Sequence, residues 1–344
     1  MEAVVLEAFG VPENLQMRQV PDPSPGQGEV LLRVQACGVC FHDVINRRGD
    51  LPRTNVPAIL GHEAAGEVIE VGSGVEGWSI GDRAATLQRL HCGDCRHCDD
   101  GRNSLCKTDT RFFGEELPGG YAGYMAAPVA GLGRVPQEIE WPVAATACCT
   151  SGTAVHVVRT RGKVQKGETV LITGASGGVG MQTVQLARHD GARVIAVTSS
   201  ESKVDLLHEA GAHHVIVATD LSFSRQVRDL TGGEGAQVAL EIVGSLTFEQ
   251  SMRALAPGGR LIVVGNLETR SVAVNPGLVI LKELEIRGAY ATTKAELQQA
   301  FELLASGALR SWVSEVLPLG DAWRAHQRLE ARAVTGRLVL TPRH

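Results

Sequence analysis

Residues Thr169-Val-Leu-Ile-Thr-Gly174-Ala-Ser-Gly177-Gly-Val-Gly180 decide the fold class of this chain. The apolar run from Thr169 to Thr173 predicts a buried β-strand, and the residues after Gly180 have a helical pattern. A strand, a glycine turn and a helix in this order begin a dinucleotide-binding βαβ unit. The glycines allow a tight turn and let a pyrophosphate approach the backbone at the N-terminus of the helix.

The turn departs from the strict G-x-G-x-x-G spacing, and a glycine run alone also fits an ordinary loop. The segments that follow favour the nucleotide-binding interpretation, because further apolar runs alternate with helical or polar sequence at residues 193–197, 215–218, 238–244 and 260–265. This alternation predicts an α/β fold with a doubly wound parallel sheet.

The end of the second predicted strand bears on the choice of nicotinamide cofactor. An NAD site carries an acidic residue there for the ribose hydroxyls, whereas this chain has Thr198, Ser199 and Ser200, followed by Lys203. Hydroxyls and a lysine suit a 2′-phosphate, so NADP(H) is favoured over NAD(H), although Glu201 is nearby and the serines also fit a helix cap. The predicted cofactor contacts are Gly174, Ser176, Gly177, Gly178, Val179, Gly180, Thr198, Ser199, Ser200, Lys203, Val243, Gly265 and Arg337.

A second informative stretch is Cys92-Gly-Asp-Cys95-Arg-His-Cys98, followed by Cys106. Cysteines at such short spacings present four sulfurs to one Zn²⁺. Disulfides or buried free thiols are the alternatives, and they are disfavoured because nothing else in the chain looks secreted. A closed site with four cysteine ligands has no open position, so its predicted role is structural.

Short strands and many glycines predict that the first 152 residues are β-rich. Candidate ligands stand at the ends of two predicted strands, at residues 30–36 and 65–71, and in a small-residue stretch at residues 143–152: they are Cys37, Cys40, His42, Asp43, His62, Glu63, Cys148 and Cys149. A Cys/His/Cys set with a spare position is typical of a catalytic zinc site. From the residues alone this grouping stays open, because a lone Cys or His more often packs in a core or lies on the surface.

Composition excludes several classes of function. The chain has 344 residues, enough for two domains, and its net charge of −5 gives no broad basic field for nucleic acid. No apolar segment approaches the length of a membrane span, and the acidic N-terminus does not resemble a signal peptide. We therefore expect a cytoplasmic protein with a small-molecule substrate and no nucleic-acid or membrane partner.

Over nearly its full length the chain resembles the zinc-containing medium-chain dehydrogenase/reductase family, of the alcohol dehydrogenase type. The motifs that carry the resemblance are the cysteines at 92, 95, 98 and 106, the segment Cys37-Gly-Val-Cys40 with Asp43, and Gly61-His62-Glu63. The resemblance implies a GroES-like catalytic domain at residues 1–152 and 293–344, a Rossmann domain at 153–292, and homodimers or homotetramers joined through the cofactor domain.

The resemblance also implies a catalytic zinc held by Cys40, His62 and Cys149, and so two zinc ions per chain. Cys149 is preferred over Cys148 because the family's cysteine lies four residues before a threonine that opens a helix, here Thr153. Glu63 would be a neighbouring or exchangeable ligand, and Asp43 would orient His62. Cys37 and Cys148 are then left as packing residues.

Three features depart from the family pattern, and one of them is Phe41, where some relatives place a polar or basic residue. His42 replaces the usual serine or threonine that passes the alcohol proton onward, so it is predicted either to relay protons or only to shape the pocket. The glycine turn looks more like the quinone reductase branch. The predicted function is a zinc-dependent, NADP(H)-linked alcohol dehydrogenase or ketone/aldehyde reductase. The alternatives are an NADPH-dependent quinone or enoyl reductase and a non-catalytic nucleotide-binding relative.

Overall fold

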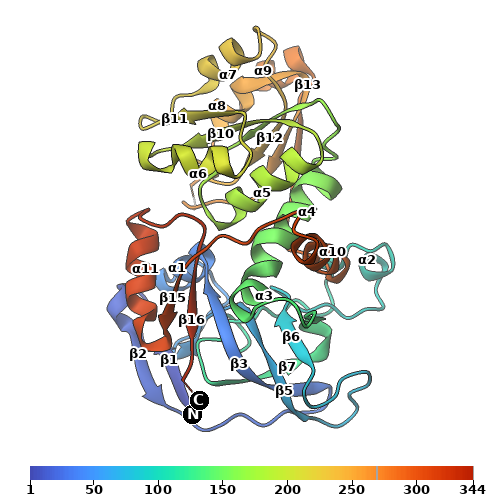
Figure 1. The fold of residues 1–344 in the computed structure, drawn as a ribbon, viewed down its shortest axis with the longest axis vertical. Coiled ribbons are helices and arrows are strands. Elements are labelled where there is room, and N and C mark those ends of the chain that lie inside the picture. The colour runs from blue at the N-terminus through green and yellow to red at the C-terminus, as the bar shows by residue number, and fades with distance from the viewer. Residues whose placement is uncertain (269, 344) are drawn as a thin grey trace. The chain divides into compact units, whose positions relative to one another are not determined.

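The computed structural model describes residues 1–268 and 270–343. The chain forms two compact units, which are Met1–Gly152 with Ala291–Ser306 and Val313–His344, and Thr153–Tyr290 with Gly307–Trp312 (Figure 1). Residues 291–292 and 307–312 thus fall outside the boundaries given above. Thr292 belongs with the first unit because its N–H donates to Gln88 and its hydroxyl to the Cys148 carbonyl. Arg310 belongs with the second, since its N–H and C=O both bond Gln185.

The main sheet of the first unit has the strand order β15-β16-β3-β5-β6-β8, and β7 also pairs with β3. A smaller sheet has the order β2-β1-β4. The predicted return of the chain end to this unit is confirmed, because β16 pairs with β3. The strands are β1 (Glu2–Leu6), β2 (Leu15–Gln19), β3 (Glu29–Val39), β4 (Ala58–Ile59), β5 (Glu63–Val71), β6 (Arg83–Thr86), β7 (Tyr124–Pro128), β8 (Leu132–Arg134), β15 (Val313–Pro318) and β16 (Arg337–Thr341).

The helices and helical turns of the first unit pack around this sheet or lie in its connecting loops. They are α1 (Phe41–Arg48), α2 (Arg96–Asp99), α3 (Trp141–Ala147), α10 (Lys294–Ala305) and α11 (Ala322–Glu330), with the π-helical turn η4 (Cys148–Gly152) and the 3₁₀ turns η1 (Pro12–Asn14), η2 (Asn103–Leu105), η3 (Val129–Gly131) and η7 (Leu319–Asp321). Small side chains, among them Ala36 of β3 and Ala144 of α3, form the core between α3 and the sheet. Alanines there let helix and sheet approach closely.

A bulge in β3 sets the direction of the residues that lead into the site. The register of β3 against β5 shifts between Val34 and Ala36. Before the shift Leu32 and Val34 point into one core, and after it Cys37 and Val39 do. An extra residue in a strand reverses the alternation of its side chains, so this bulge places Cys37 in the core as packing, while Cys40 ends the run at α1.

The second unit confirms the predicted doubly wound parallel sheet. Its strand order is β11-β10-β9-β12-β13-β14, and every pair is parallel. The order reverses between β9 and β12, which is where such sheets bind ligands. Its strands are β9 (Thr169–Ile172), β10 (Arg193–Thr198), β11 (His214–Val217), β12 (Ala236–Glu241), β13 (Leu255–Val263) and β14 (Glu285–Gly288), the last not predicted from the sequence.

The helices of the second unit are α4 (Thr153–Val155), α5 (Gly178–His189), α6 (Val204–Glu209), α7 (Ser224–Leu230), α8 (Phe248–Ala254) and α9 (Pro276–Lys282), with the π-helical η5 (His156–Arg161) and the 3₁₀ turn η6 (Glu201–Lys203). The helices α5 to α9 each lie between two successive strands in the chain, whereas α4 and η5 precede β9. Within the described residues, no helix combines the length and the apolar character needed to cross a membrane.

Candidate active site and metal centres

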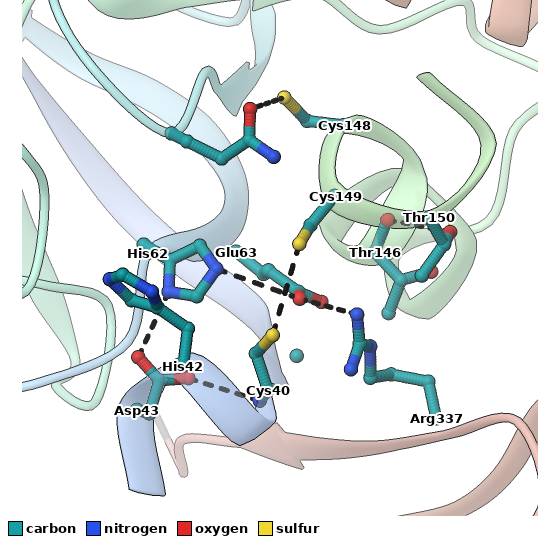
Figure 2. Close-up of polar contacts among 12 residues, drawn as sticks. Cys40, His42, Asp43, His62, Glu63, Thr146, Cys148, Cys149, Thr150 and Arg337 are labelled. Carbon is teal, nitrogen blue, oxygen red and sulfur yellow. Dashed lines mark hydrogen bonds and ion pairs between the residues drawn. The ribbon is translucent and has the colours of Figure 1, made fainter. Parts of the chain in front are cut away.

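Four side chains from three distant segments meet in the first unit. Cys40 lies between β3 and α1, His62 directly precedes β5, Glu63 begins β5, and Cys149 belongs to the turn η4. One ligand atom from each lies within 4.8 Å of all the others, and all four residues are buried. Figure 2 shows their side chains directed at a common point. The antiparallel register that sets Gly38 opposite Glu63 brings the ends of β3 and β5 together.

Asp43 fixes the orientation of the His62 imidazole. In the neutral ring, Nδ1–H of His62 donates to Oδ1 of Asp43 at 2.9 Å, and Nε2 is then the nitrogen available to a metal ion. Oδ2 of the same carboxylate accepts the backbone N–H of Cys40 at 3.0 Å. Burial opposes the charge of Asp43, but His62 lowers the pKa of this carboxyl below its ordinary value. The ionised Asp43 therefore holds two members of the cluster at once.

The donors in the cluster fit a divalent zinc ion. The sulfurs of Cys40 and Cys149 are 3.8 Å apart, and their hydrogen bond lowers the pKa of Cys40 well below its ordinary value. Both carboxylate oxygens of Glu63 are buried and make no hydrogen bond of good geometry among the described residues, although Nη2 of Arg337 lies within ion-pair distance of one of them. Thiolates, imidazole nitrogen and carboxylate oxygen are the usual ligands of Zn²⁺, and a cation would compensate charge that is otherwise costly to bury.

Arg337 faces this cluster from β16. Its Nη2 lies 2.9 Å from Oε1 of Glu63, and both side chains are buried. Burial raises the pKa of Glu63 to about 8, while the guanidinium of Arg337 acts in the opposite direction. Arg337 was predicted as a cofactor contact, and in this structure its guanidinium pairs with Glu63.

The second cluster is formed by Cys92, Cys95, Cys98 and Cys106. Their closest sulfur pairs are 3.5 to 3.9 Å apart, so the disulfide alternative is wrong, because an S–S bond is about 2.05 Å long. The edge of a tetrahedron with Zn–S bonds of about 2.3 Å is about 3.8 Å. The four thiols thus have the spacing that one tetrahedral zinc requires.

His42 lies beside the first cluster and is held by a carboxylate that the sequence did not reveal. Its Nε2 is 2.5 Å from Oε1 of Glu115, whose side chain is only 3 % exposed. The imidazole stacks on Phe112 at 5.4 Å between ring centroids and meets the His62 ring edge-on at 5.1 Å. Burial opposes the charge of Glu115, but the hydrogen bond from His42 lowers its pKa. His42 and Glu115 therefore form a polar pair next to the metal ligands.

The glycine turn in the second unit has the geometry of a nucleotide-binding turn. Gly174 has a φ of +58°, and Gly177 directly precedes α5. A Cβ on Gly180 would overlap the carbonyl oxygens of Gly174 and Ala175, so only glycine allows this close approach. Gly177, Gly178 and Gly180 leave the N-terminus of α5 open to the approach of a pyrophosphate.

Residues at the end of β10 complete this region. The Thr198 hydroxyl lies 3.5 Å from that of Ser176 and accepts the backbone N–H of Ser200. Ser200 precedes the turn η6, but its side chain makes no capping hydrogen bond there. The alternative interpretation of these serines as a helix cap is therefore not supported at Ser200. Lys203 ends η6 and is partly buried, which lowers its pKa.

Comparisons with known proteins agree with this geometry. Residues 26–137 match the alcohol dehydrogenase GroES-like domain, and residues 178–306 match the zinc-binding dehydrogenase domain. Acryloyl-coenzyme A reductase of Metallosphaera sedula is 34% identical over 342 residues, which are 99% of this chain and 100% of that protein. The chain belongs to the zinc-containing medium-chain dehydrogenase/reductase family. It is accordingly an oxidoreductase of the zinc-binding dehydrogenase type, whose family uses zinc and a nicotinamide cofactor.

Two further relatives are similar to this dehydrogenase over its full length. An alcohol dehydrogenase of Geobacillus stearothermophilus is 32% identical over 343 residues, covering 99% of each protein. The crystal structure of AibC is 68% identical, has a TM-score of 0.94, and covers 100% of this chain and 96% of that one. Both comparisons extend over the whole chain, so the family assignment includes both units.

The count that selected Cys149 agrees with the local structure, because α4 begins at Thr153. Thr153 is the first residue of α4 and directly follows the π-helical turn η4. Cys149 points into the cluster, whereas the Cys148 thiol donates to Oε1 of Gln88 at 3.6 Å (Figure 2). A π-turn widens the helix locally and is frequent at functional sites. That Cys40, His62 and Cys149 bind zinc remains a prediction.

Removal of one cysteine from the second cluster should separate the two metal centres. We expect Cys106→Ser to lower the zinc content from two ions to one per chain and to leave the ion at Cys40 in place. The melting temperature should fall by roughly 10 °C, since a loss of several kcal/mol shifts a domain of this size by about 2–4 °C per kcal/mol. Metal analysis and calorimetry test this, with His97→Ala in the same loop as control. Two retained ions in Cys106→Ser would refute the assignment.

Proposed function

We propose that this enzyme reduces the C=C bond of a 2-enoyl thioester of the acryloyl-CoA type, with NADPH as hydride donor. The observation that carries this choice is the full-length similarity to acryloyl-coenzyme A reductase. The glycine turn from Gly174 to Gly180 supports it, because it looks more like that of the quinone reductase branch than like that of the usual zinc alcohol dehydrogenases. The sequence motifs favoured an alcohol dehydrogenase first and left an enoyl reductase as an alternative. We now propose the enoyl reductase.

Reduction of such a C=C bond needs a hydride at Cβ and a proton at Cα. NADPH supplies the hydride and becomes NADP⁺, and the proton comes from an acid of the protein. A zinc ion held by Cys40, His62 and Cys149 would act as a Lewis acid on the thioester carbonyl oxygen, where negative charge develops. Asp43 keeps Nε2 of His62 available for that ion. Glu63 and Arg337 form a buried ion pair beside the same ligands.

His42 is the group that this proposal assigns to the proton transfer. Because Nε2–H is donated to Glu115, Nδ1 is the ring nitrogen left to release or take up a proton. The buried carboxylate of Glu115 fixes the tautomer and the orientation of the ring, as acidic partners of catalytic histidines do. Stacking on Phe112 fixes the plane of the ring. The pair thus replaces the single hydroxyl that alcohol dehydrogenases carry at the position of His42.

Interconversion of an alcohol and a carbonyl compound is the second candidate. The similarity to the Geobacillus alcohol dehydrogenase supports it, and the same Lewis acid would then act on an alcohol or ketone oxygen while His42 relays the alcohol proton. A non-catalytic relative is disfavoured by the intact set of Cys40, His62, Glu63 and Cys149. Such a protein has no need to keep a buried group of charged ligands.

The two enzyme candidates differ in where the hydrogens end up. Zinc-loaded protein is mixed with NADPH or NADH and with acryloyl-CoA, a ketone, an aldehyde or a quinone, and absorbance at the nicotinamide band is followed. We expect acryloyl-CoA to be converted to propionyl-CoA, with deuterium from D₂O at Cα and deuterium from labelled NADPH at Cβ. Turnover of the ketone or aldehyde alone, with the deuteride on the carbonyl carbon, would contradict the proposal.

The cofactor preference is tested separately at Lys203. We propose that its ammonium group binds the 2′-phosphate of NADPH beside the hydroxyls of Thr198 and Ser199. A hydrogen bond to a charged group is worth about 1.5–3 kcal/mol, so Lys203→Ala should lower kcat/KM for NADPH at least about tenfold and leave kcat/KM for NADH nearly unchanged. Lys203→Arg keeps the charge and serves as control. Equal losses with both cofactors would show that Lys203 does not read the phosphate.

A further inference from the structure

A chain of hydrogen bonds leads from the metal ligand His62 into the interior of the first unit. Beyond His62 and Asp43 lies the hydroxyl of Tyr121, 3.4 Å from Oδ2 of Asp43. The same hydroxyl is 3.1 Å from Nε2 of His326, a residue of α11. Asp43, Tyr121 and His326 are each fully buried. These hydrogen bonds connect Tyr121 and His326, which are 205 positions apart in the sequence, to the candidate catalytic centre.

The position of the proton on His326 determines which group donates and which accepts in each of these hydrogen bonds. Burial lowers the pKa of His326 to about 4, so the ring is neutral and carries one proton. Nδ1 of His326 is buried and has no hydrogen-bond partner among the described residues. A buried N–H without an acceptor costs more than a buried lone pair of this kind. The proton therefore belongs on Nε2, which donates it to the oxygen of Tyr121.

The direction continues from Tyr121 to the metal ligand. Burial raises the pKa of Tyr121 well above its ordinary value, so its hydroxyl keeps its proton. Since the hydroxyl accepts from His326, it donates to Oδ2 of Asp43, which also accepts the N–H of Cys40. Asp43 is thereby held ionised, and its other oxygen accepts Nδ1–H of His62. Every donor in the chain then has an acceptor, and Nε2 of His62 is left bare.

The Tyr121 ring is fixed against the segment that carries His62. Gly61, which directly precedes His62, has a φ of +97°. A Cβ on Gly61 would lie 2.4 Å from Cδ1 of Tyr121, so the ring fills the space that any other residue would need. The ring also meets that of His326 edge-on at 5.9 Å. The hydroxyl therefore has little freedom to turn away from Asp43.

We propose that Tyr121 and His326 are positioning residues for the catalytic metal, because their hydrogen bonds hold Asp43 and, through it, the metal-binding nitrogen of His62. The inference rests on the metal centre of the proposed function and not on the identity of the substrate. Groups that orient a metal-binding histidine typically contribute about 10- to 100-fold in metal affinity. Tyr121 and His326 act one and two steps further away, so we expect the lower end of this range.

The test measures metal binding without any substrate. Protein with zinc at both centres is mixed with a chromogenic chelator, and the release of each ion is timed for the wild type, Tyr121→Phe, His326→Leu and His326→Gln. Tyr121→Phe removes only the hydroxyl, and His326→Gln retains an N–H donor. We expect Tyr121→Phe and His326→Leu to release one ion about tenfold faster, with His326→Gln close to the wild type. Tyr124→Phe on β7 is the matched tyrosine control.

The cysteine cluster at residues 92–106 is the internal reference for folding. If the release of both ions accelerates equally, the variants loosen the whole unit, and the proposal is overturned. It is also overturned if neither ion is released faster. A changed release rate in a protein that does not reduce acryloyl-CoA would refute the proposed substrate and leave this inference standing, so the two failures are distinguishable.

Discussion

The serine variant of Cys149 is expected to lose the catalytic metal and nearly all reductase activity. The Cys149 sulfur lies 3.8 Å from that of Cys40 in the buried cluster, and a serine hydroxyl is a poor replacement for a thiolate ligand. Lewis-acid stabilisation is worth several kcal/mol, and each 1.36 kcal/mol is tenfold in rate. We therefore expect a fall in kcat of about 10³-fold or more and a zinc content of one ion per chain, measured by metal analysis and steady-state kinetics.

The adjacent cysteine offers a closely matched control. Cys148 is also buried, but its thiol donates to Gln88 and lies outside the cluster. A serine hydroxyl can make the same hydrogen bond, so Cys148→Ser should keep two zinc ions and an activity close to that of the wild type. A Cys149→Ser protein that still holds two ions, or a Cys148→Ser protein that loses one, would mean that the assignment of the ligand is wrong.

Replacement of His42 by alanine should have the second largest effect. Proton transfer by a positioned side chain contributes about 10²- to 10⁴-fold, so we expect kcat with acryloyl-CoA to fall about 10²-fold or more. Zinc content should not change, because His42 is not among the four clustered ligands. Glu115→Gln keeps a hydrogen-bond partner for Nε2 and removes the charge, and it should give an intermediate loss. The pH dependence of kcat, measured for all three proteins, should flatten in His42→Ala.

The opposing interpretation of His42 makes a different prediction. If the imidazole only shapes the pocket together with Phe112, His42→Ala should raise KM and leave the pH dependence of kcat as it is in the wild type. His42→Phe would then restore activity by refilling the space. Either result would remove the proton-transfer role and leave the metal centre unaffected.

The parts of this fold that the sequence predicted are those encoded locally. The strand, turn and helix from Thr169 to Arg188 follow one another directly, so their hydrophobic pattern and glycines were sufficient. The cluster of Cys92, Cys95, Cys98 and Cys106 could also be predicted from the sequence, because its members lie within fifteen residues. The grouping of Cys40, His62 and Cys149 was available only from the resemblance to a family, since 109 positions separate the two cysteines.

Other parts of the site depend on tertiary packing, which cannot be predicted from a local sequence pattern. Glu115 lies in an irregular segment beside a second glutamate, and nothing in that segment distinguishes the buried carboxylate that holds His42 from an exposed one. His326 is on an amphipathic helix, where a single histidine usually packs or faces solvent. Its contact with Tyr121 arises only when α11 docks on the unit, so this interaction could not be inferred from spacing.

The most direct test of the account is the anomalous diffraction signal of a crystal of this protein at the zinc absorption edge. The account predicts two peaks per chain. One should lie about 2.3 Å from the sulfurs of Cys40 and Cys149 and about 2.0–2.1 Å from Nε2 of His62, and the other should lie at the centre of the four cysteines 92, 95, 98 and 106. A peak at the four cysteines alone, with none between Cys40, His62 and Cys149 in zinc-saturated protein, would contradict it.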